Sequence, residues 1–256
     1  MTRRELLAEG RTAEVFAYGE GMVLKLDRPE WNGLAAFESG RLADLADAGL
    51  PVARPRGTVT VDGRSGVILD RVDGPSLADV LAGCSADEAE ELADRFAALQ
   101  SACNAVTVDG LPDLVPRLRG EIEAFVADAG LRAELLGLLA ALDDGGRGVC
   151  HYDFHPANVL VGPGGWVVID WLTVASGPPP ADLARTLVLW GRHSSEPVVT
   201  FLRAVRRCGR ERRGVDDGII DCWVRIAAAA RLAEGFEGEE ASWLGEVAAG
   251  SVRLFA

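Results

Sequence analysis

The segment that decides the fold is Cys150-His-Tyr-Asp-Phe-His-Pro-Ala-Asn-Val-Leu-Val161. It contains the pattern His151-x-Asp153-x-x-x-x-Asn158. An aspartate on a loop, a few residues ahead of an asparagine, can accept a proton from a substrate hydroxyl. Asp153 is therefore the candidate catalytic base.

Two short apolar runs, 158–161 and 166–170, flank a Gly-Pro-Gly-Gly turn and predict a β-hairpin. Asn158 begins the first run and Asp170 ends the second, so their side chains can converge on one face. Amide and carboxylate oxygens suit Mg²⁺, a hard cation that keeps water and phosphate oxygens in its shell. Asn158 and Asp170 are the predicted Mg²⁺ ligands, and with Asp153 they indicate kinase-type phosphoryl transfer.

The basic residues contain one clear exception. The chain has 26 lysines and arginines in total, and only Lys25 is a lysine. It lies inside the apolar run Met22–Leu26, where a compact ammonium on a strand can reach a phosphate. The pattern suggests a chemical reason for lysine at this position.

Composition excludes several classes of protein. With 256 residues, 48% of them hydrophobic, the chain is long enough for a large core. The formal net charge of −13 argues against a nucleic-acid partner. No apolar run approaches the length of a membrane span or of a signal peptide, so we expect neither a membrane partner nor export, and a cytoplasmic location. The five cysteines form no Cys-x-x-Cys pair, which predicts free thiols.

The pattern along the chain predicts two lobes. Residues 1–70 are expected to form a β-rich unit with one helix at 31–48 and two hairpins. The strands of those hairpins are predicted at 14–18 and 22–26, and at 58–61 and 66–69. The polar Gly-Pro segment 71–75 is the candidate hinge.

Residues 76–256 are expected to be mainly helical and to carry the catalytic loops and the substrate pocket. Ser85-x-x-Glu88 is a capping box that begins one helix. Further helices are predicted at 114–129 and 131–142. The charge run 203–213 is interpreted as a solvated helix end and loop.

The sequence resembles the aminoglycoside phosphotransferase family, which shares the protein-kinase-like fold. The family pattern His-Gly-Asp-x-His-x-x-Asn, followed by Ile-Asp-Trp or Ile-Asp-Phe, is similar to His151–Asn158 and Ile169-Asp170-Trp171. The resemblance covers most of the chain. It implies an α+β, bilobal protein-kinase-like fold, with a small β-rich N-terminal lobe and a larger, mainly helical C-terminal lobe.

The resemblance also implies roles for further residues. Lys25 matches the lysine that contacts the α- and β-phosphates, and Glu38 matches the helix glutamate that holds it. Asp182 matches an aspartate that buttresses the catalytic loop, and His151 would anchor that loop. The remaining nucleotide contacts would come from Gly10 in the N-terminal loop and from backbone groups at Leu69, Arg71 and Val72.

The chain departs from the family pattern at some positions. Gly10 is not part of a G-x-G-x-x-G loop, Tyr152 replaces a glycine beside the base, and Pro178 stands where an aspartate often follows the glycine. The role of His155 is left open between packing and phosphate contact. None of these departures removes a catalytic group.

The expected reaction is Mg²⁺-dependent transfer of the γ-phosphate of ATP or GTP to a hydroxyl of a small molecule. An aminoglycoside-like antibiotic is one acceptor, and a sugar, choline or a macrolide are alternatives. An acidic set late in the chain either lines a pocket for a polycation or forms a solvated face. That set is Asp216, Asp217, Asp221, Glu234, Glu237, Glu239 and Glu240.

Two other classes of function use the same residues. A catalytically inactive nucleotide-binding module would keep the fold without turnover. A metal-dependent hydrolase would use His151, Asp153 and His155 as ligands, but it leaves Lys25 and Asn158 without a role. The oligomeric state is not indicated by the sequence.

Overall fold

A computed structural model describes residues 5–255. The chain divides into two compact units, and each is described separately. The first contains the described residues up to Leu77 together with Ala157–Leu172, and the second contains Ala78–Pro156 together with the residues from Thr173 onward. The segment 157–172 thus belongs to the first unit although it lies far along the chain. The lobe boundaries at 1–70, 71–75 and 76–256 remain a prediction.

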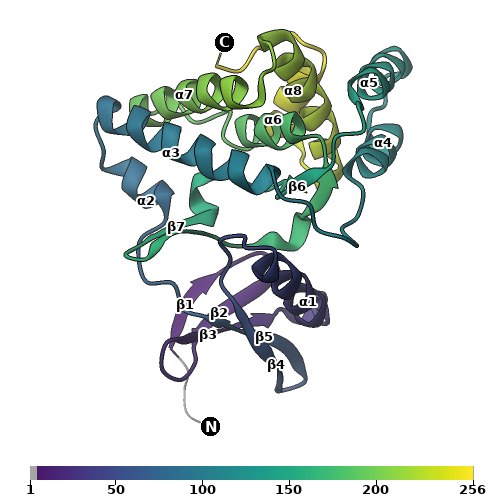
Figure 1. The fold of residues 1–256 in the computed structure, drawn as a ribbon. Helices are drawn as coiled ribbons and strands as arrows, with labels where there is room; N and C mark the ends of the chain where they lie inside the picture. The colour runs from purple at the N-terminus through teal and green to yellow at the C-terminus, as the bar shows by residue number, and fades with distance from the viewer. Residues whose placement is uncertain (1–4, 256) are drawn as a thin grey trace. The chain divides into compact units, whose positions relative to one another are not determined.

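The first unit is built on a five-stranded antiparallel sheet in the order β1-β2-β3-β5-β4 (Figure 1). Its strands are β1 Leu6–Glu9, β2 Ala13–Ala17, β3 Met22–Asp27, β4 Pro55–Val61 and β5 Arg64–Asp70. Both predicted hairpins are present, and β1 is an additional strand. Lys25 lies in the middle of the sheet, opposite Val15 on β2 and Val67 on β5.

Helix α1 Leu34–Asp47 follows a short 3-10 turn, η1 Pro29–Trp31. The helix was predicted at 31–48, and it begins later because a buried carboxylate defines its start. Asp27 accepts hydrogen bonds from the backbone N–H groups of Gly33 and Ala35, at 2.9 and 3.0 Å. This cap fixes α1 relative to the end of β3.

A further hairpin, from the later part of the chain, belongs to the first unit, with strands β7 Val159–Gly162 and β8 Gly165–Val168. The Val161 backbone N–H donates to the Pro75 carbonyl at 2.9 Å. Gly74 has a φ of 145°, and a Cβ there would collide with the Val161 carbonyl. Glycine is therefore required where the segment after β5 approaches β7.

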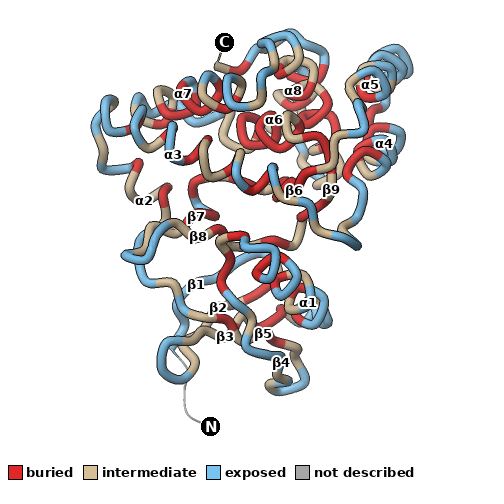
Figure 2. The backbone as a smooth tube through the Cα atoms, viewed as in Figure 1, coloured by how far each residue is buried: buried red, intermediate tan, exposed pale blue. Residues whose placement is uncertain are grey.

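The second unit is mainly helical (Figure 1). Its helices are α2 Leu77–Ala82, α3 Ala86–Asn104, α4 Leu114–Phe125, α5 Ala129–Leu142, α6 Pro179–Leu189, α7 Glu196–Arg213, α8 Asp217–Arg231 and α9 Gly238–Ala248, with the 3-10 turn η4 Leu232–Glu234. Strands β6 Gly148–Cys150 and β9 Ala175–Gly177 pair beside them, and the 3-10 turns η2 Pro156–Asn158 and η3 Trp171–Thr173 lie where the chain passes between the units. Figure 2 shows α6 buried along most of its length.

The structure confirms one predicted helix start and shifts the boundary between two other predicted helices. Ser85 and Glu88 form the expected capping box of α3. The helix predicted at 114–129 ends at Phe125, because Asp128 accepts from the Leu131 N–H at 2.7 Å and begins the next helix. The predicted break between the two helices is present, at 126–128 instead of at 130.

The charge run 203–213 is the end of a helix, as predicted: it forms the last part of α7, and most of its charged residues are exposed. Arg206 is the clearest exception, because its side chain is only 3% exposed. Arg206 pairs with Asp217 and Asp221, at 3.1 and 2.8 Å. These carboxylates, which lie in a later part of the sequence, stabilise the buried guanidinium.

The five cysteines are free thiols, as predicted. No helix within residues 5–255 is long and apolar enough to span a membrane.

Candidate functional site

The Lys25 ammonium contacts two carboxylates within the first unit. Its Nζ lies 2.7 Å from Glu38 Oε1 and 3.0 Å from Asp170 Oδ1. Strand β3 supplies the lysine, α1 the glutamate, and the residues after β8 the aspartate. Three predicted site residues that are up to 145 positions apart are thus brought together.

Burial differs among the three side chains. Glu38 is 3% exposed and Lys25 13%, whereas Asp170 is 42% exposed. Burial by itself lowers the pKa of Lys25, but the charges of Glu38 and Asp170 outweigh it and raise the pKa above its ordinary value. The lysine is therefore held as a cation, fixed on its buried side by Glu38 and open to exchange on the side of Asp170.

Asn158 and Asp170 lie at the same end of the β7–β8 hairpin. The Ile169 N–H donates to the Asn158 carbonyl at 2.9 Å. This hydrogen bond extends the strand pairing by one residue past the paired Val159 and Val168. Asp170 has a φ of 63°, in a region that is costly for residues other than glycine, asparagine and aspartate. The chemistry of this donor set, one amide and one exposed carboxylate, fits Mg²⁺, which takes its other ligands from water and phosphate.

No group of three or more His, Cys, Asp or Glu side chains in residues 5–255 is arranged to hold a metal ion by itself. The hydrolase alternative requires such a group around His151, Asp153 and His155. His151 is fully buried, and its Nδ1 accepts from the Asp153 backbone N–H at 3.2 Å. Through that hydrogen bond the His151 ring supports the loop that carries Asp153, in place of the ligand role that the hydrolase alternative gives it.

The loop that carries Asp153 is fixed by hydrogen bonds within the second unit. The Tyr152 N–H donates to Asp182 Oδ1 at 2.7 Å. Thr173 Oγ1 donates to the His151 carbonyl at 2.8 Å, and Thr186 Oγ1 donates to the Phe154 carbonyl at 2.6 Å. The backbone on both sides of Asp153 is therefore fixed, while its carboxylate keeps 28% exposure.

Aromatic rings lie next to Asp153. His155 Nε2 is 3.8 Å from Asp153 Oδ2, and the His155 ring stacks on Trp190 with centroids 6.2 Å apart. Trp190 in turn stacks on His193 at 4.3 Å. The three rings thus form a stacked row that begins next to the base.

The remaining predicted nucleotide contacts lie in the first unit. Gly10 follows β1, and its N–H donates to the Ala13 carbonyl at 2.8 Å, which closes the β1–β2 turn. Leu69 is buried in β5. The Arg71 N–H donates to the Gly21 carbonyl at 2.9 Å, so a nucleotide base would compete with Gly21 for it. Val72 follows directly and extends this backbone segment.

Several supporting residues were missed from sequence. Asn104 Nδ2 donates to Asp182 Oδ2 at 3.0 Å and to the Val149 carbonyl at 2.9 Å. Gln100, one turn earlier on α3, donates to Thr186 Oγ1 at 3.0 Å. The sequence does carry a signal for these two residues. Gln100 and Asn104 are amides four positions apart on the otherwise apolar face of α3, and buried polar groups need hydrogen-bond partners.

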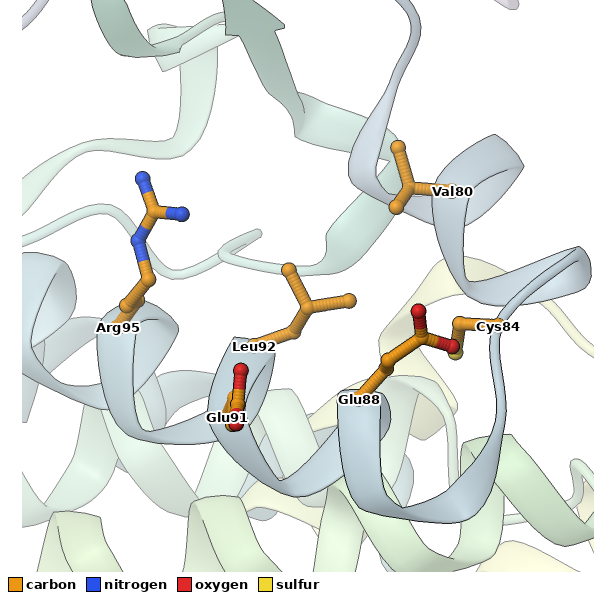
Figure 3. A pocket seen from close by; sticks show the side chains of 6 residues that line it. All are labelled: Val80, Cys84, Glu88, Glu91, Leu92 and Arg95. Carbon is orange, nitrogen blue, oxygen red and sulfur yellow. The ribbon is translucent and has the colours of Figure 1, made fainter.

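A separate hollow of about 210 Å³ lies between α2 and α3 (Figure 3). None of the predicted site residues lines it, and its lining is Val80, Cys84, Glu88, Glu91, Leu92 and Arg95.

Known structures share this fold. An aminoglycoside-3'-phosphotransferase of type VIII is 21% identical, with a TM-score of 0.63 over 88% of this chain and 91% of that one. Aminoglycoside phosphotransferase APH(4)-Ia is 19% identical, with a TM-score of 0.67 over 97% and 92%. The amicoumacin kinase hAmiN, in complex with AMP-PNP, Ca²⁺ and Ami, is 13% identical, with a TM-score of 0.61 over 95% and 86%. The predicted α+β, protein-kinase-like fold class is thereby confirmed.

No curated protein matches the chain in sequence. The profile of the phosphotransferase enzyme family, in contrast, matches residues 4–216. Because this match covers most of the chain and the fold agrees with it, the chain belongs to the phosphotransferase enzyme family.

Proposed function

We propose that this chain is a Mg²⁺-dependent kinase that transfers the γ-phosphate of ATP or GTP to a hydroxyl of a small molecule. The observation that carries the proposal is the contact of Lys25 with both Glu38 and Asp170. A buried lysine between a fixed and an exposed carboxylate suits a group that must exchange one partner for a phosphate. An inactive binding module would not require Asp153 and both predicted metal ligands as well.

On the nucleotide side, Lys25 donates to the α- and β-phosphates while Glu38 keeps the ammonium in place. Asn158 and Asp170 would hold Mg²⁺ through their oxygens, and the metal would supply positive charge next to the phosphates. Asp170 would then leave its contact with Lys25. Gly10 and the backbone at Leu69, Arg71 and Val72 border the nucleotide.

On the acceptor side, Asp153 orients the hydroxyl and accepts its proton as the oxygen bonds to the γ-phosphorus. The bond from that phosphorus to the bridging oxygen breaks, and the nucleoside diphosphate leaves. His151 and Asp182 act as structural support, since they bond to the backbone N–H groups of Asp153 and Tyr152. A fixed loop keeps the carboxylate in a geometry that does not have to be organised during the reaction.

The acceptor is a small hydroxylated compound. The solved complexes of related fold contain hygromycin B, gentamicin and Ami, so antibiotics, and with them a role in resistance, are one candidate class. Sugars, choline and macrolides are the other candidate classes of acceptor. Free cysteines and a nucleotide donor fit a cytoplasmic site of action.

The test is nucleotide consumption by the purified chain with Mg²⁺-ATP and Mg²⁺-GTP, against a panel of these acceptors. We expect acceptor-stimulated turnover that disappears when EDTA is added. Thermal unfolding in the presence of each nucleotide measures binding separately. Stabilisation by nucleotide without turnover on any acceptor would favour the inactive module, and no response of either kind would exclude the kinase assignment.

A further inference from the structure

The side chains of Asp182 and Thr186, which hold the backbone next to Asp153, are themselves bonded to helix α3. Asp182 Oδ2 accepts from Asn104 Nδ2, and Thr186 Oγ1 accepts from Gln100 Nε2, both at 3.0 Å. The two amides lie four positions apart, on the same face of α3. Each of them therefore turns its nitrogen toward a side chain that supports the catalytic loop.

The oxygen atoms of the same two amides accept hydrogen bonds from one arginine. Arg213 Nη2 donates to Gln100 Oε1 at 3.0 Å and to Asn104 Oδ1 at 2.5 Å. Arg213 ends α7, which packs along α3 (Figure 1). A terminal guanidinium nitrogen carries two hydrogens, so it can bond to both amides at once. Two hydrogen-bond paths thus begin at a single nitrogen.

The two paths end on the two sides of the proposed base. One reaches the Tyr152 N–H, which donates to Asp182 Oδ1 at 2.7 Å. The other reaches the Phe154 carbonyl, which accepts from Thr186 Oγ1 at 2.6 Å. Tyr152 and Phe154 are the residues directly before and after Asp153. A single side chain of α7 is therefore connected to the backbone on both sides of the carboxylate.

Arg213 decides which way each amide faces. Arginine is only a donor, whereas an amide side chain offers an oxygen at one end and N–H groups at the other. With the guanidinium on one side, the oxygens of Gln100 and Asn104 must face it, and their N–H groups must face the loop supports. Without it, Asn104 could turn by half a rotation and present its oxygen to the Asp182 carboxylate, where two acceptors repel each other.

The guanidinium of Arg213 is fixed by further contacts within the same unit. Its Nε donates to the Pro179 carbonyl at 3.2 Å, and its Nη1 donates to the Gly209 carbonyl at 2.9 Å. Burial lowers the pKa of Arg213, and the charge of Asp182 opposes this effect. An arginine nevertheless stays protonated at neutral pH. Cation and carboxylate are thus joined through the Asn104 amide, which both of them hold in one orientation.

We propose that Arg213 is a positioning residue for phosphoryl transfer, because through Gln100 and Asn104 it orients the loop that carries Asp153. This inference rests on the proposed kinase function and deepens it. A base acts efficiently only when its carboxylate is already in place before the reaction. Loss of Arg213 should therefore lower kcat. KM for ATP should change little, since Lys25 belongs to the other unit.

The experiment compares Arg213→Met with Arg206→Met, which also removes from α7 a guanidinium that is bonded within the fold. The partners of Arg206, Asp217 and Asp221, do not contact the catalytic loop supports, so it is the matched control. Both substitutions should lower the free energy of unfolding. Only Arg213→Met should lower kcat, by about 10- to 100-fold, because small misplacements of reacting groups are costly. Arg213→Lys should recover part of kcat, since an ammonium keeps donors but not the fork.

Hydrogen exchange at the Tyr152 N–H measures the support of the loop without any need for activity. It should be faster in Arg213→Met than in the wild-type chain and in Arg206→Met, and intermediate in Arg213→Lys. If Arg213→Met does not fold, Arg213→Lys replaces it in both comparisons. Equal kcat values in the Arg213 variant and the Arg206 control, or equal exchange at Tyr152, would overturn the inference and leave the kinase function standing. A wild-type chain without turnover would instead remove the kinase function, while exchange still shows whether Arg213 holds the loop.

Discussion

Two groups of cations held by carboxylates lie in different units. The Lys25 cluster of the first unit consists of Lys25, Glu38 and Asp170. The Arg–Glu chain of the second unit is a row of ion pairs formed by Arg185, Glu234, Arg231, Glu240, Arg192 and Glu239. The cluster uses the single lysine of the chain, and one of its carboxylates, Asp170, is 42% exposed. The Arg–Glu chain uses guanidiniums, and its inner member Arg185 is 7% exposed. A compact ammonium can change partners, whereas a planar fork keeps the partners it has. The first arrangement suits turnover of a phosphate ligand, and the second holds its charges in fixed, mutually neutralising pairs.

The largest effect is expected at the base. Asp153→Ala should lower kcat by about 10²- to 10⁴-fold, the usual contribution of a general base. Nucleotide affinity should stay within a few fold, because the Lys25 cluster lies in the other unit and is left intact. Steady-state kinetics and calorimetry separate the two quantities. Asp109→Ala, on an exposed loop, is the control, and an unchanged kcat in Asp153→Ala would remove the proposed base.

The next effect tests the exposed end of the Lys25 cluster. Asp170→Ala should weaken Mg²⁺-nucleotide binding by about 100-fold, since even groups that only support a metal ligand contribute about 10- to 100-fold. Titration of nucleotide binding at several Mg²⁺ concentrations measures this directly. Asp94→Ala is the matched control, because Asp94 also pairs with a cation, Arg212 at 2.6 Å, but in an exposed pair of the second unit. Wild-type Mg²⁺-ATP affinity in Asp170→Ala would refute the metal assignment.

A smaller effect tests whether lysine itself is needed. Lys25→Arg keeps the charge, but it puts a larger planar guanidinium where a compact ammonium contacts Glu38 at 2.7 Å and Asp170 at 3.0 Å, so we expect one of the two contacts to be lost. Loss of one charge-assisted hydrogen bond, about 1.5 kcal/mol, corresponds to roughly a tenfold loss in kcat/KM for ATP. The converse control, Arg56→Lys in an exposed pair, should be neutral. Full activity of Lys25→Arg would make the single lysine a coincidence.

The smallest effect concerns the support of Glu38. Asp27→Ala removes the cap of α1 and should lower the free energy of unfolding by about 1 kcal/mol, with a modest rise in KM for ATP because α1 carries Glu38. Asp128→Ala removes the corresponding cap of α5 and should cost a similar amount of stability with no change in KM. Denaturant unfolding and ATP kinetics of the two variants make the comparison. Equal KM values for ATP in the two variants would show that the α1 cap does not influence nucleotide binding.

Much of the candidate site could be predicted because its chemistry is concentrated in short segments. Asp153 lies on a loop, and Asn158 and Asp170 lie at the ends of a hairpin. Loops and hairpins are local structures, so short sequence patterns predict them. Glu38 came only from the resemblance, since a glutamate on a helix is ordinarily a solvated residue. The supporting residues Asn104 and Thr186 were not predicted, because their partners lie 78 and 32 positions away.

The sequence by itself determined the alternation of strands and helices, the hairpin that carries Asn158 and Asp170, and the family to which the chain belongs. These properties depend on local periodicity and on motifs within a few residues of one another. Only the tertiary structure decided which arginine neutralises which carboxylate. A charge run such as 203–213 looks the same in sequence whether it is solvated or buried. Its fate depends on distant partners, as Arg206 and Asp221 illustrate, because burial of a charge is tolerated only where the fold brings an opposite charge to it.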